Sequence, residues 1–349
     1  MRAKFTPLRF IIGLVVALIL TVVILNRIPW NQYIVLPDGA HPVAPLVYVQ
    51  GARKPRDTGT LYFVDVFVRR ASQFDRLFRW LHGKVGIPLV LHSHATYLPA
   101  KLVVPPGSSD NAVNQANLRE MATSQQIAAA VAERQLHLPV VTHPFGVLVD
   151  NVYEDVPAAA KVDPADVIIA ADGKPTITLP ELQAALKPVK PGQVVTLTIR
   201  RGSQTVTERV KTVADPRDKA HAFIGVQVEQ GAKITLPRKV KIDANGVGGP
   251  SAGLAFTLQV MEQLGANVTH GYTVAATGEI TLNGAVTAIG GVEQKTWGVR
   301  ATGAQVFLVP VDGGNATTAE KYAGPNLKII PVTSIGQALR ALAALPKLP

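Results

Sequence analysis

The order of apolar and polar positions separates an N-terminal apolar run from a longer region of mixed strand and helix patterns. The run extends from Phe10 to Leu25 without a charged residue. It is close to the ~17 to 25 residues that a helix needs to cross a bilayer. Trp30 and Tyr33 follow it and fit an aromatic belt at the membrane interface. We therefore expect a membrane-spanning helix over residues 10–30.

The charges around this run predict its orientation. Arg2, Lys4 and Arg9 come before it, so the positive-inside rule places the N-terminus in the cytoplasm and the remainder outside it. A signal peptide also has a basic start and an apolar core, but no small-x-small cleavage site follows here. The sequence therefore favours an uncleaved, single-pass anchor in the cell membrane.

Strand and helix patterns alternate in the remaining chain, which predicts an α/β fold. Residues 61–68 form a short, β-branched strand pattern, and residues 117–134 have helical periodicity. Asp65 is unusual within such a strand. We favour an edge or solvent-facing carboxylate there over a site residue. Residues 223–228 alternate as a strand that leads toward a Gly/Pro-rich turn. Further strand patterns lie at residues 273–276, 305–310 and 327–331.

Composition excludes several kinds of chemistry. The net charge is +11, but the Lys and Arg residues are dispersed, so we expect a basic surface and no nucleic-acid partner. The absence of cysteine excludes disulfides, thiol catalysis and cysteine metal sites. His92 and His94 have no third ligand at a useful spacing, so neither a metal nor a cofactor is expected. No Gly-x-x-x-x-Gly-Lys-Ser/Thr loop is present, so the sequence implies no attached ATPase.

The strongest candidate chemistry is a serine on a Gly/Pro-rich turn. Ser251 lies within residues 248–253, directly before a helical pattern at residues 254–264. Backbone N–H groups at a helix start can stabilise a developing oxyanion, although such a serine can also be an ordinary N-cap. Lys295 follows an apolar, glycine-rich segment. A lysine can activate a serine hydroxyl if burial lowers its pKa toward neutrality.

Several motifs around these two residues occur in a fixed order. They are Gly-Pro-Ser-Ala-Gly at 249–253, Thr-Gly-Glu-Ile at 277–280, Gly284, Val286, and Ile-Gly-Gly-Val at 289–292. This region resembles the proteolytic domain of Lon, the Ser-Lys dyad peptidases. The resemblance implies that Ser251 is the nucleophile, Lys295 the general base and Thr277 a neighbour that orients the lysine. It implies supporting positions at Gly249, Pro250 and Ala252. Lon usually has an acidic residue three positions before the serine, where this chain has Gly248.

A second resemblance covers residues 138–216. Its motifs include Phe145-Gly146-Val147-Leu148-Val149, Asp-Gly-Lys-Pro at 172–175, a helix pattern near 179–186 and a strand pattern at 194–200. This segment is similar to bacterial PDZ domains. The resemblance implies that an extended peptide adds as a strand beside Val147 to Val149, with its carboxylate near the amides of Phe145 and Gly146. The alternative is a domain that only braces the protease.

These patterns predict an α/β Lon-type proteolytic domain combined with a small, β-rich PDZ domain of two helices, after one N-terminal transmembrane helix. We expect the PDZ domain to be inserted within the catalytic domain, because Met-Ala-Thr-Ser at 121–124 resembles an early helix of Lon-type domains. The expected segments are a basic cytoplasmic tail at 1–9, the anchor at 10–30, a tether at 31–45, an N-terminal Lon-like part at 46–137, the PDZ domain at 138–216 and a catalytic part at 217–349.

The predicted function is that of an ATP-independent, membrane-anchored, extracytoplasmic serine endopeptidase acting on peptides or proteins. Its membrane contacts are lipids around the N-terminal helix. Lon-type domains often form rings, and the sequence leaves homo-oligomerisation open. The alternative is a catalytically idle, membrane-tethered PDZ adaptor with a Lon-like scaffold.

Overall fold

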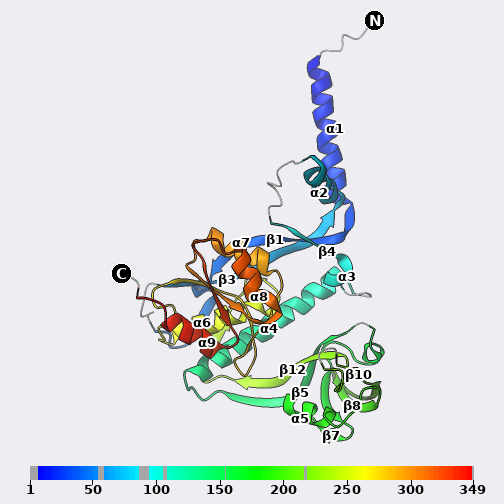
Figure 1. The fold of residues 1–349 in the computed structure, drawn as a ribbon, viewed down its shortest axis with the longest axis vertical. Helices are drawn as coiled ribbons and strands as arrows, with labels where there is room; N and C mark the ends of the chain where they lie inside the picture. The colour runs from blue at the N-terminus through cyan, green and yellow to red at the C-terminus, as the bar shows by residue number, and fades with distance from the viewer. Residues whose placement is uncertain are drawn as a thin grey trace. The chain divides into compact units, whose positions relative to one another are not determined.

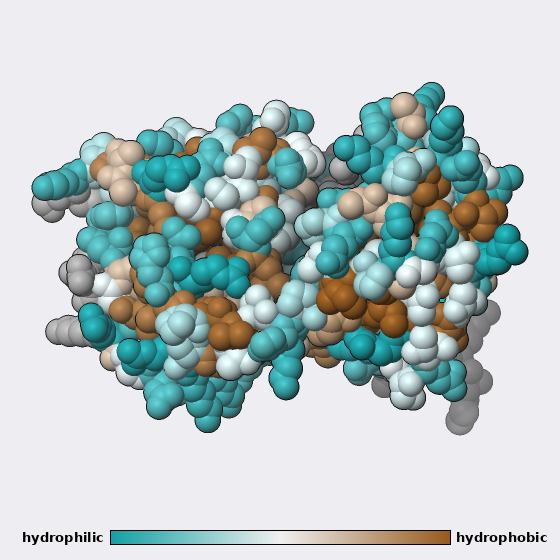
Figure 2. All heavy atoms as spheres, turned by 90° about the horizontal axis from the view of Figure 1, so that it is seen from below, coloured by the Kyte–Doolittle hydropathy of each residue, from teal (hydrophilic) through white to brown (hydrophobic). Residues whose placement is uncertain are grey.

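The computed structural model describes residues 7–53, 59–85, 94–104, 108–153, 155–215 and 218–347. The chain divides into two compact units. Unit 1 comprises Met1–His137 and Arg238–Pro349, and unit 2 comprises Leu138–Pro237. Unit 2 is therefore an insertion in the sequence of unit 1, as the colour gradient of Figure 1 makes visible. On the face drawn in Figure 2, smaller apolar patches lie among hydrophilic side chains.

Unit 1 contains a six-stranded mixed sheet with the order β18-β17-β14-β3-β1-β4. Its strands are β1 (Pro29–Pro42), β3 (Thr60–Ser72), β4 (Thr96–Pro99), β14 (Thr273–Ala276), β17 (Val306–Pro310) and β18 (Lys328–Val332). β14 pairs in parallel with both β3 and β17, whereas β1 is antiparallel to β3 and β4. The strand predicted at residues 61–68 thus lies at the centre of this sheet, beside β14.

Unit 1 also contains helices, most of which pack on this sheet or on one another. They are α1 (Pro7–Arg27), α2 (Gln73–Val85), α3 (Ala100–Val103), α4 (Asp110–Gln135), α6 (Gly253–Gln263), α7 (Val292–Ala301), α8 (Asn315–Tyr322) and α9 (Ile335–Ala343). The short 3-10 turns are η1 (Ala44–Leu46), η4 (Pro250–Ala252) and η5 (Asp312–Gly314). The remaining strands pair β2 (Val47–Val49) with β13 (Val240–Ile242) and β15 (Glu279–Ile280) with β16 (Val286–Thr287).

Two of these helices form the centre of the apolar core. α6 buries Leu254, Phe256 and Leu258 completely. It packs against α4, whose buried face carries alanines such as Ala128 and Ala130. Small side chains on one helix let the larger side chains of the other interdigitate without voids. The α4–α6 pair thereby fixes the position of η4, the turn that precedes α6.

Helix α1 differs from all the others in composition and exposure. It has 21 residues, and its segment Phe10–Arg27 is long and apolar enough to cross a membrane. None of that segment is buried against the rest of the protein. A signal sequence has the same length and composition, so these properties define a candidate span.

Unit 2 is built around a sheet with the order β12-β5-β6-β8-β9, to which β7 adds through β6. Its elements are β5 (Val141–Val152), η3 (Pro157–Ala160), β6 (Val167–Ala171), β7 (Lys174–Pro175), α5 (Leu179–Leu186), β8 (Val194–Arg201), β9 (Gln204–Lys211), β10 (Val213–Ala214), β11 (Ala222–Phe223) and β12 (Val226–Thr235). A capping box of Thr178 and Glu181 starts α5. The core contains Ile168, Leu197 and Ile199.

The strand at residues 223–228 was expected in the catalytic part, but it belongs to unit 2. β12 pairs antiparallel with β5 along its whole length, from Val226 opposite Val152 to Thr235 opposite Val141. The boundary between the units accordingly falls after Pro237, about twenty residues later than the predicted boundary after residue 216. Alternation identifies a strand from local sequence, but it does not specify the partner, because register depends on distant residues.

Candidate active site

Hydrogen bonds to α4 fix the turn that carries Ser251. Gly249 has φ 84°, a left-handed conformation that glycine adopts without steric cost. Its N–H donates to the carbonyl oxygen of Asn117 at 2.8 Å. The buried hydroxyl of Ser124 donates to the carbonyl oxygen of Pro250 at 3.0 Å. Ser251 therefore lies on a backbone that is fixed on both sides before α6 begins.

The same packing explains why this chain has no acidic residue three positions before the serine. A Cβ atom built at Gly248 would lie 2.8 Å from the Cβ of Asn117, closer than two carbon atoms approach in folded proteins. A carboxylate at position 248 would therefore require α4 to move away.

Two glycines bring α7, which carries Lys295, close to β1 and β3. A Cβ atom at Gly291 would lie 2.9 Å from a methyl group of Val66, and a Cβ at Gly298 would collide with the carbonyl oxygen of Asp38. The two glycines precede and follow Lys295 by about one helical turn. Because α7 can approach this closely, Lys295 is enclosed and is only 2% exposed.

Ser251, Lys295 and Thr277 meet in the structure. The Nζ atom of Lys295 donates a hydrogen bond to Oγ of Ser251 at 2.7 Å and to Oγ1 of Thr277 at 3.3 Å. The hydroxyl of Thr277 in turn donates to the carbonyl oxygen of Ser251 at 3.2 Å. A nucleophile and a base within hydrogen-bond distance, with a third group on the base, are the geometric requirements for an activated serine.

The electrostatics of Lys295 suit a base. Burial lowers its pKa from 10.5 to about 7, because the charged ammonium form loses hydration, and the nearby charge of Asp65 partly opposes this shift. With a pKa near neutrality, a substantial fraction of Lys295 is uncharged at neutral pH. Only the uncharged amine can accept a proton from a hydroxyl.

Asp65 lies beside this site, contrary to the expectation of an edge or solvent-facing carboxylate. β3 is an interior strand of the sheet, and Asp65 Oδ1 lies 3.5 Å from Nε2 of His41. Burial and the charge of Asp38 raise the pKa of Asp65, whereas His41 and Lys295 lower it. The sequence signal was a single acid in an apolar strand. That signal could identify an unusual residue, but not its neighbours.

Among the described residues, one group has donor atoms suited to a cation. Asp38, His41 and Asp65 each offer a ligand atom within 4.8 Å of the others. Asp38 is exposed, and exposed carboxylates commonly remain hydrated without a metal, so the geometry does not assign a metal site. His94 stacks on Trp297 at 3.5 Å, and His92 lies outside the described residues.

The expected peptide site at Phe145, Gly146, Val147, Leu148 and Val149 has no free strand edge in the structure. On one side of β5, Val147 is opposite Gln230 and Val149 is opposite Val228 of β12. On the other side, Val147 is opposite Ile168 of β6. Strand addition requires unpaired N–H and C=O groups, so a peptide cannot add here while β12 is in place.

Gln230 fixes β12 in this position. Its side-chain oxygen accepts the N–H of Leu179, the first residue of α5, at 2.9 Å. Its side-chain nitrogen donates to the carbonyl oxygens of Gly146 at 3.2 Å and Ile177 at 3.1 Å. A single side chain thus joins β12, the start of α5 and the middle of β5. The sequence could predict β5 as a strand, but not a partner about eighty residues later.

Comparison with known families finds two matches, whose bounds differ from those of the two units. Residues 219–344 match the Lon protease (S16) C-terminal proteolytic domain, and residues 114–212 match a PDZ domain. The Lon match includes Ser251, Thr277 and Lys295, the three residues that meet in the structure. One part of the chain is therefore similar to the Lon proteolytic domain and another part to a PDZ domain, and both follow an N-terminal apolar helix that is a candidate membrane span.

Two curated relatives illustrate the extent of the similarity. The Lon protease of Chloroflexus aggregans is 29% identical over 156 residues, which cover 42% of this chain and 17% of the relative. The Lon protease of Mesomycoplasma hyopneumoniae is 43% identical over 94 residues, or 27% of this chain and 9% of the relative. The chain therefore spans less than a fifth of the length of these relatives. Among solved structures, the PDZ domain of an SdrC-like protein from Listeria monocytogenes has 27% identity and a TM-score of 0.23, covering 25% of this chain and 90% of that chain.

Proposed function

We propose that the protein is a membrane-anchored serine endopeptidase that cleaves peptides or unfolded proteins without nucleotide hydrolysis. Ser251 is the nucleophile and Lys295 is the general base. The observation that carries the proposal is the 2.7 Å contact between Lys295 Nζ and Ser251 Oγ within a buried environment that lowers the lysine pKa.

The proposed reaction proceeds through an acyl-enzyme. Uncharged Lys295 takes the proton of Ser251 Oγ as that oxygen attacks the scissile carbonyl carbon. We assign the developing oxyanion to backbone N–H groups of η4 after Pro250, because the N–H groups of Gly253 and Leu254 at the start of α6 already donate to the carbonyl oxygens of Pro250 and Gly278. Lys295 then gives its proton to the leaving amine, and the amine departs from the Ser251 ester. Finally Lys295 deprotonates a water molecule as the water attacks the ester carbon, the C–O bond to Ser251 Oγ breaks, and Lys295 returns the proton to Oγ as the carboxylic acid product leaves.

The match to a PDZ domain is the reason to propose peptide or protein ligands. We assign β12 the role of a strand that can leave the sheet. While β12 pairs with β5, the edge of β5 beside α5 is filled. A peptide gains that edge only when β12 leaves. The chain has no cysteine, so Leu148→Cys with Glu229→Cys, which lie directly opposite, can lock the strand by oxidation. Peptide binding that survives oxidation contradicts this role, and the reduced protein is the control.

For localisation, we propose that α1 spans the cell membrane with a cytoplasmic N-terminus, and that the rest of unit 1 and all of unit 2 are extracytoplasmic. The apolar segment Phe10–Arg27 supports the span, and Arg2, Lys4 and Arg9 before it support the orientation. Resistance to alkaline extraction tests the span. Reporter fusions at both chain ends test the orientation.

The decisive experiment uses the full chain in detergent, an intrinsically unfolded protein substrate, and no nucleotide. Ser251→Ala, Lys295→Ala and Lys295→Arg should each abolish the fragments seen by mass spectrometry, since residues that act as one unit lose function together and a guanidinium cannot serve as a base. Thermal unfolding must be unchanged in Ser251→Ala. Turnover in the arginine variant would contradict the dyad. No cleavage and no fluorophosphonate labelling of the unaltered protein would favour the idle adaptor.

A further inference from the structure

We propose that α2 lies on the surface of the bilayer that α1 crosses, where Leu77 and Trp80 enter the interface and Arg76 and Lys84 contact anionic headgroups. The inference rests on membrane anchoring by α1, as proposed above. It goes further because it assigns a second lipid contact to a helix outside the anchor.

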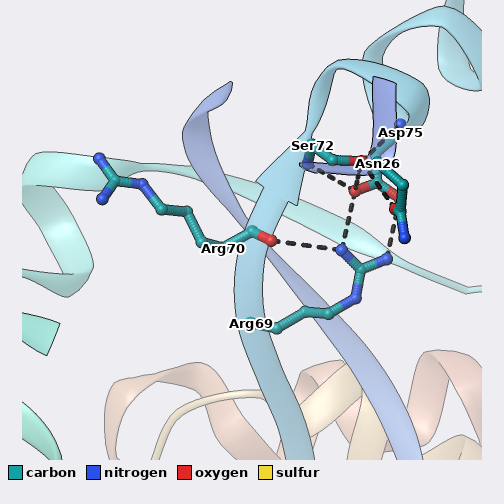
Figure 3. Close-up of polar contacts among 5 residues, drawn as sticks. All are labelled: Asn26, Arg69, Arg70, Ser72 and Asp75. Carbon is teal, nitrogen blue, oxygen red and sulfur yellow. Dashed lines mark hydrogen bonds and ion pairs between the residues drawn. The ribbon is translucent and has the colours of Figure 1, made fainter. Parts of the chain in front are cut away.

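A network of polar contacts ties the start of α2 to the end of α1 (Figure 3). The hydroxyl of Ser72 donates to Oδ1 of Asn26 at 3.2 Å. Outside the view of Figure 3, the N–H of Gln73 donates to the carbonyl oxygen of Ile28 at 2.9 Å. α2 therefore begins at the level at which α1 ends. If α1 spans the bilayer, α2 begins at its surface.

A buried ion pair makes this junction rigid. Both guanidinium nitrogens of Arg69 donate to the carboxylate of Asp75 at 2.8 Å, and Asp75 also accepts the N–H of Ser72 at 2.6 Å. Asp75 is completely buried, and hydrogen bonding to Arg69 and Ser72 holds its pKa below the ordinary value despite burial. A bidentate, buried pair of this kind fixes the direction in which a helix leaves a strand.

The outer face of α2 combines large apolar side chains with cations. Leu77 is 41% exposed and Trp80 is 56% exposed. Arg76 and Lys84 stand four positions before and after Trp80, so all three lie on one helix face. In the described part of the chain, neither Arg76 nor Lys84 forms an ion pair. Tryptophan between cations, on a helix with an apolar stripe, is typical of helices that lie in the membrane interface.

Further aromatic and cationic groups lie near the end of α1. The rings of Trp30 and Tyr97 are 5.8 Å apart, and the guanidinium of Arg79 lies 4.8 Å from the centroid of the Tyr97 ring. Trp30 follows α1 by three positions. These rings form an aromatic group beside the anchor. A lipid bilayer fits this face better than a protein partner for two reasons. The face begins where α1 leaves the bilayer, and its exposed charges are positive.

The test uses the full chain in vesicles and tryptophan fluorescence. The chain has 3 tryptophans, at positions 30, 80 and 297, so replacing two at a time by phenylalanine leaves one reporter. Vesicles contain phosphatidylcholine brominated on its acyl chains, with or without phosphatidylglycerol. We expect the fluorescence of Trp80 to be quenched at least twofold, that of Trp30 to be quenched as well, and that of Trp297 to be unchanged.

The outcomes separate this inference from anchoring itself. Quenching of Trp30 without quenching of Trp80 overturns the inference and leaves the anchor in place. Protein that fails to float with the vesicles after an alkaline wash overturns the anchor. Trp80 fluorescence that changes on dilution in the vesicles, but not with brominated lipid, identifies a second copy as the occupant and also overturns the inference.

Charge reversal tests the headgroup contact. Arg76→Glu with Lys84→Glu should abolish the extra quenching of Trp80 that phosphatidylglycerol produces. Lys187→Glu with Lys190→Glu, exposed positions of unit 2, makes the same charge change and should have no effect. Circular dichroism and peptidase activity on a soluble substrate should be unaltered in both variants. Extra quenching that persists after reversal at α2 contradicts the electrostatic part.

Discussion

The pH dependence of peptidase activity tests the state of Lys295 most directly. Burial lowers the pKa of Lys295 to about 7, and the base must be uncharged to accept the Ser251 proton. For a lysine whose pKa is lowered, the uncharged form increases as pH rises through that value. Activity should therefore rise with pH through about 7, rather than through the ordinary lysine range near 10.5.

The size of the effect follows from the fraction of uncharged lysine. With a pKa of about 7, the uncharged form makes up about 1% at about pH 5, about half at about pH 7 and about 90% at about pH 8. The ratio kcat/KM should therefore increase about 90-fold between the lower and upper of these values and then level off. With a base of ordinary lysine pKa, kcat/KM would still rise about ten-fold per pH unit between about pH 7 and about pH 8.

The assay measures kcat/KM on an internally quenched, uncharged peptide in buffers of constant ionic strength. Intrinsic fluorescence confirms folding at each pH, and Ser251→Ala gives the background. Asp65→Asn is the matched variant: it removes a charge that raises the pKa of Lys295, so the midpoint should move to lower pH. A flat profile, or a midpoint above about 9 in the folded protein, would refute a buried lysine base.

Three further changes test the packing around the site. Gly298→Ala should lower the free energy of unfolding by more than about 2 kcal/mol in denaturant titrations, because its Cβ meets the Asp38 carbonyl; unchanged stability would contradict the close approach of α7. Ser124→Ala leaves the Pro250 carbonyl without its donor, so kcat should fall several-fold with a stability loss of about 1 to 3 kcal/mol, and equal kcat would show that α4 does not hold the turn. Leu197→Ala, in the core of unit 2, should cost about 2 to 5 kcal/mol in hydrogen exchange of unit 2 and spare cleavage of short peptides; loss of that cleavage would argue against separate cores.

The residues proposed for the dyad could be predicted because each belongs to a local motif. Ser251 lies on a Gly/Pro-rich turn before a helix, and Lys295 follows a glycine-rich segment. Thr277 precedes Gly278 in a third motif of the same region. Each motif alone also has an ordinary structural explanation, so it is their common order and spacing, which resemble those of the Lon proteolytic domain, that identify these residues without the fold.

The surroundings of the dyad depend on contacts between distant segments. Asp65 approaches Lys295 because α7 packs against β3, and a strand pattern does not specify which helix covers the strand. Ser124 lies in a pattern that sequence analysis identified, but its acceptor, the Pro250 carbonyl, is 126 residues away. The pairing of β12 with β5 was missed for the same reason, since alternation defines a face and not a neighbour.

The antiparallel pairing of β5 with β12 has a consequence for how this insert can be gained or lost. Val141 and Thr235 stand opposite each other where the chain enters and leaves unit 2, as do the two ends of any hairpin. A two-residue reverse turn is sufficient to join neighbouring antiparallel strands. The whole insert can therefore be exchanged for a short turn, or for another domain whose ends lie close together, in a single genetic event that leaves every strand of the six-stranded sheet in register.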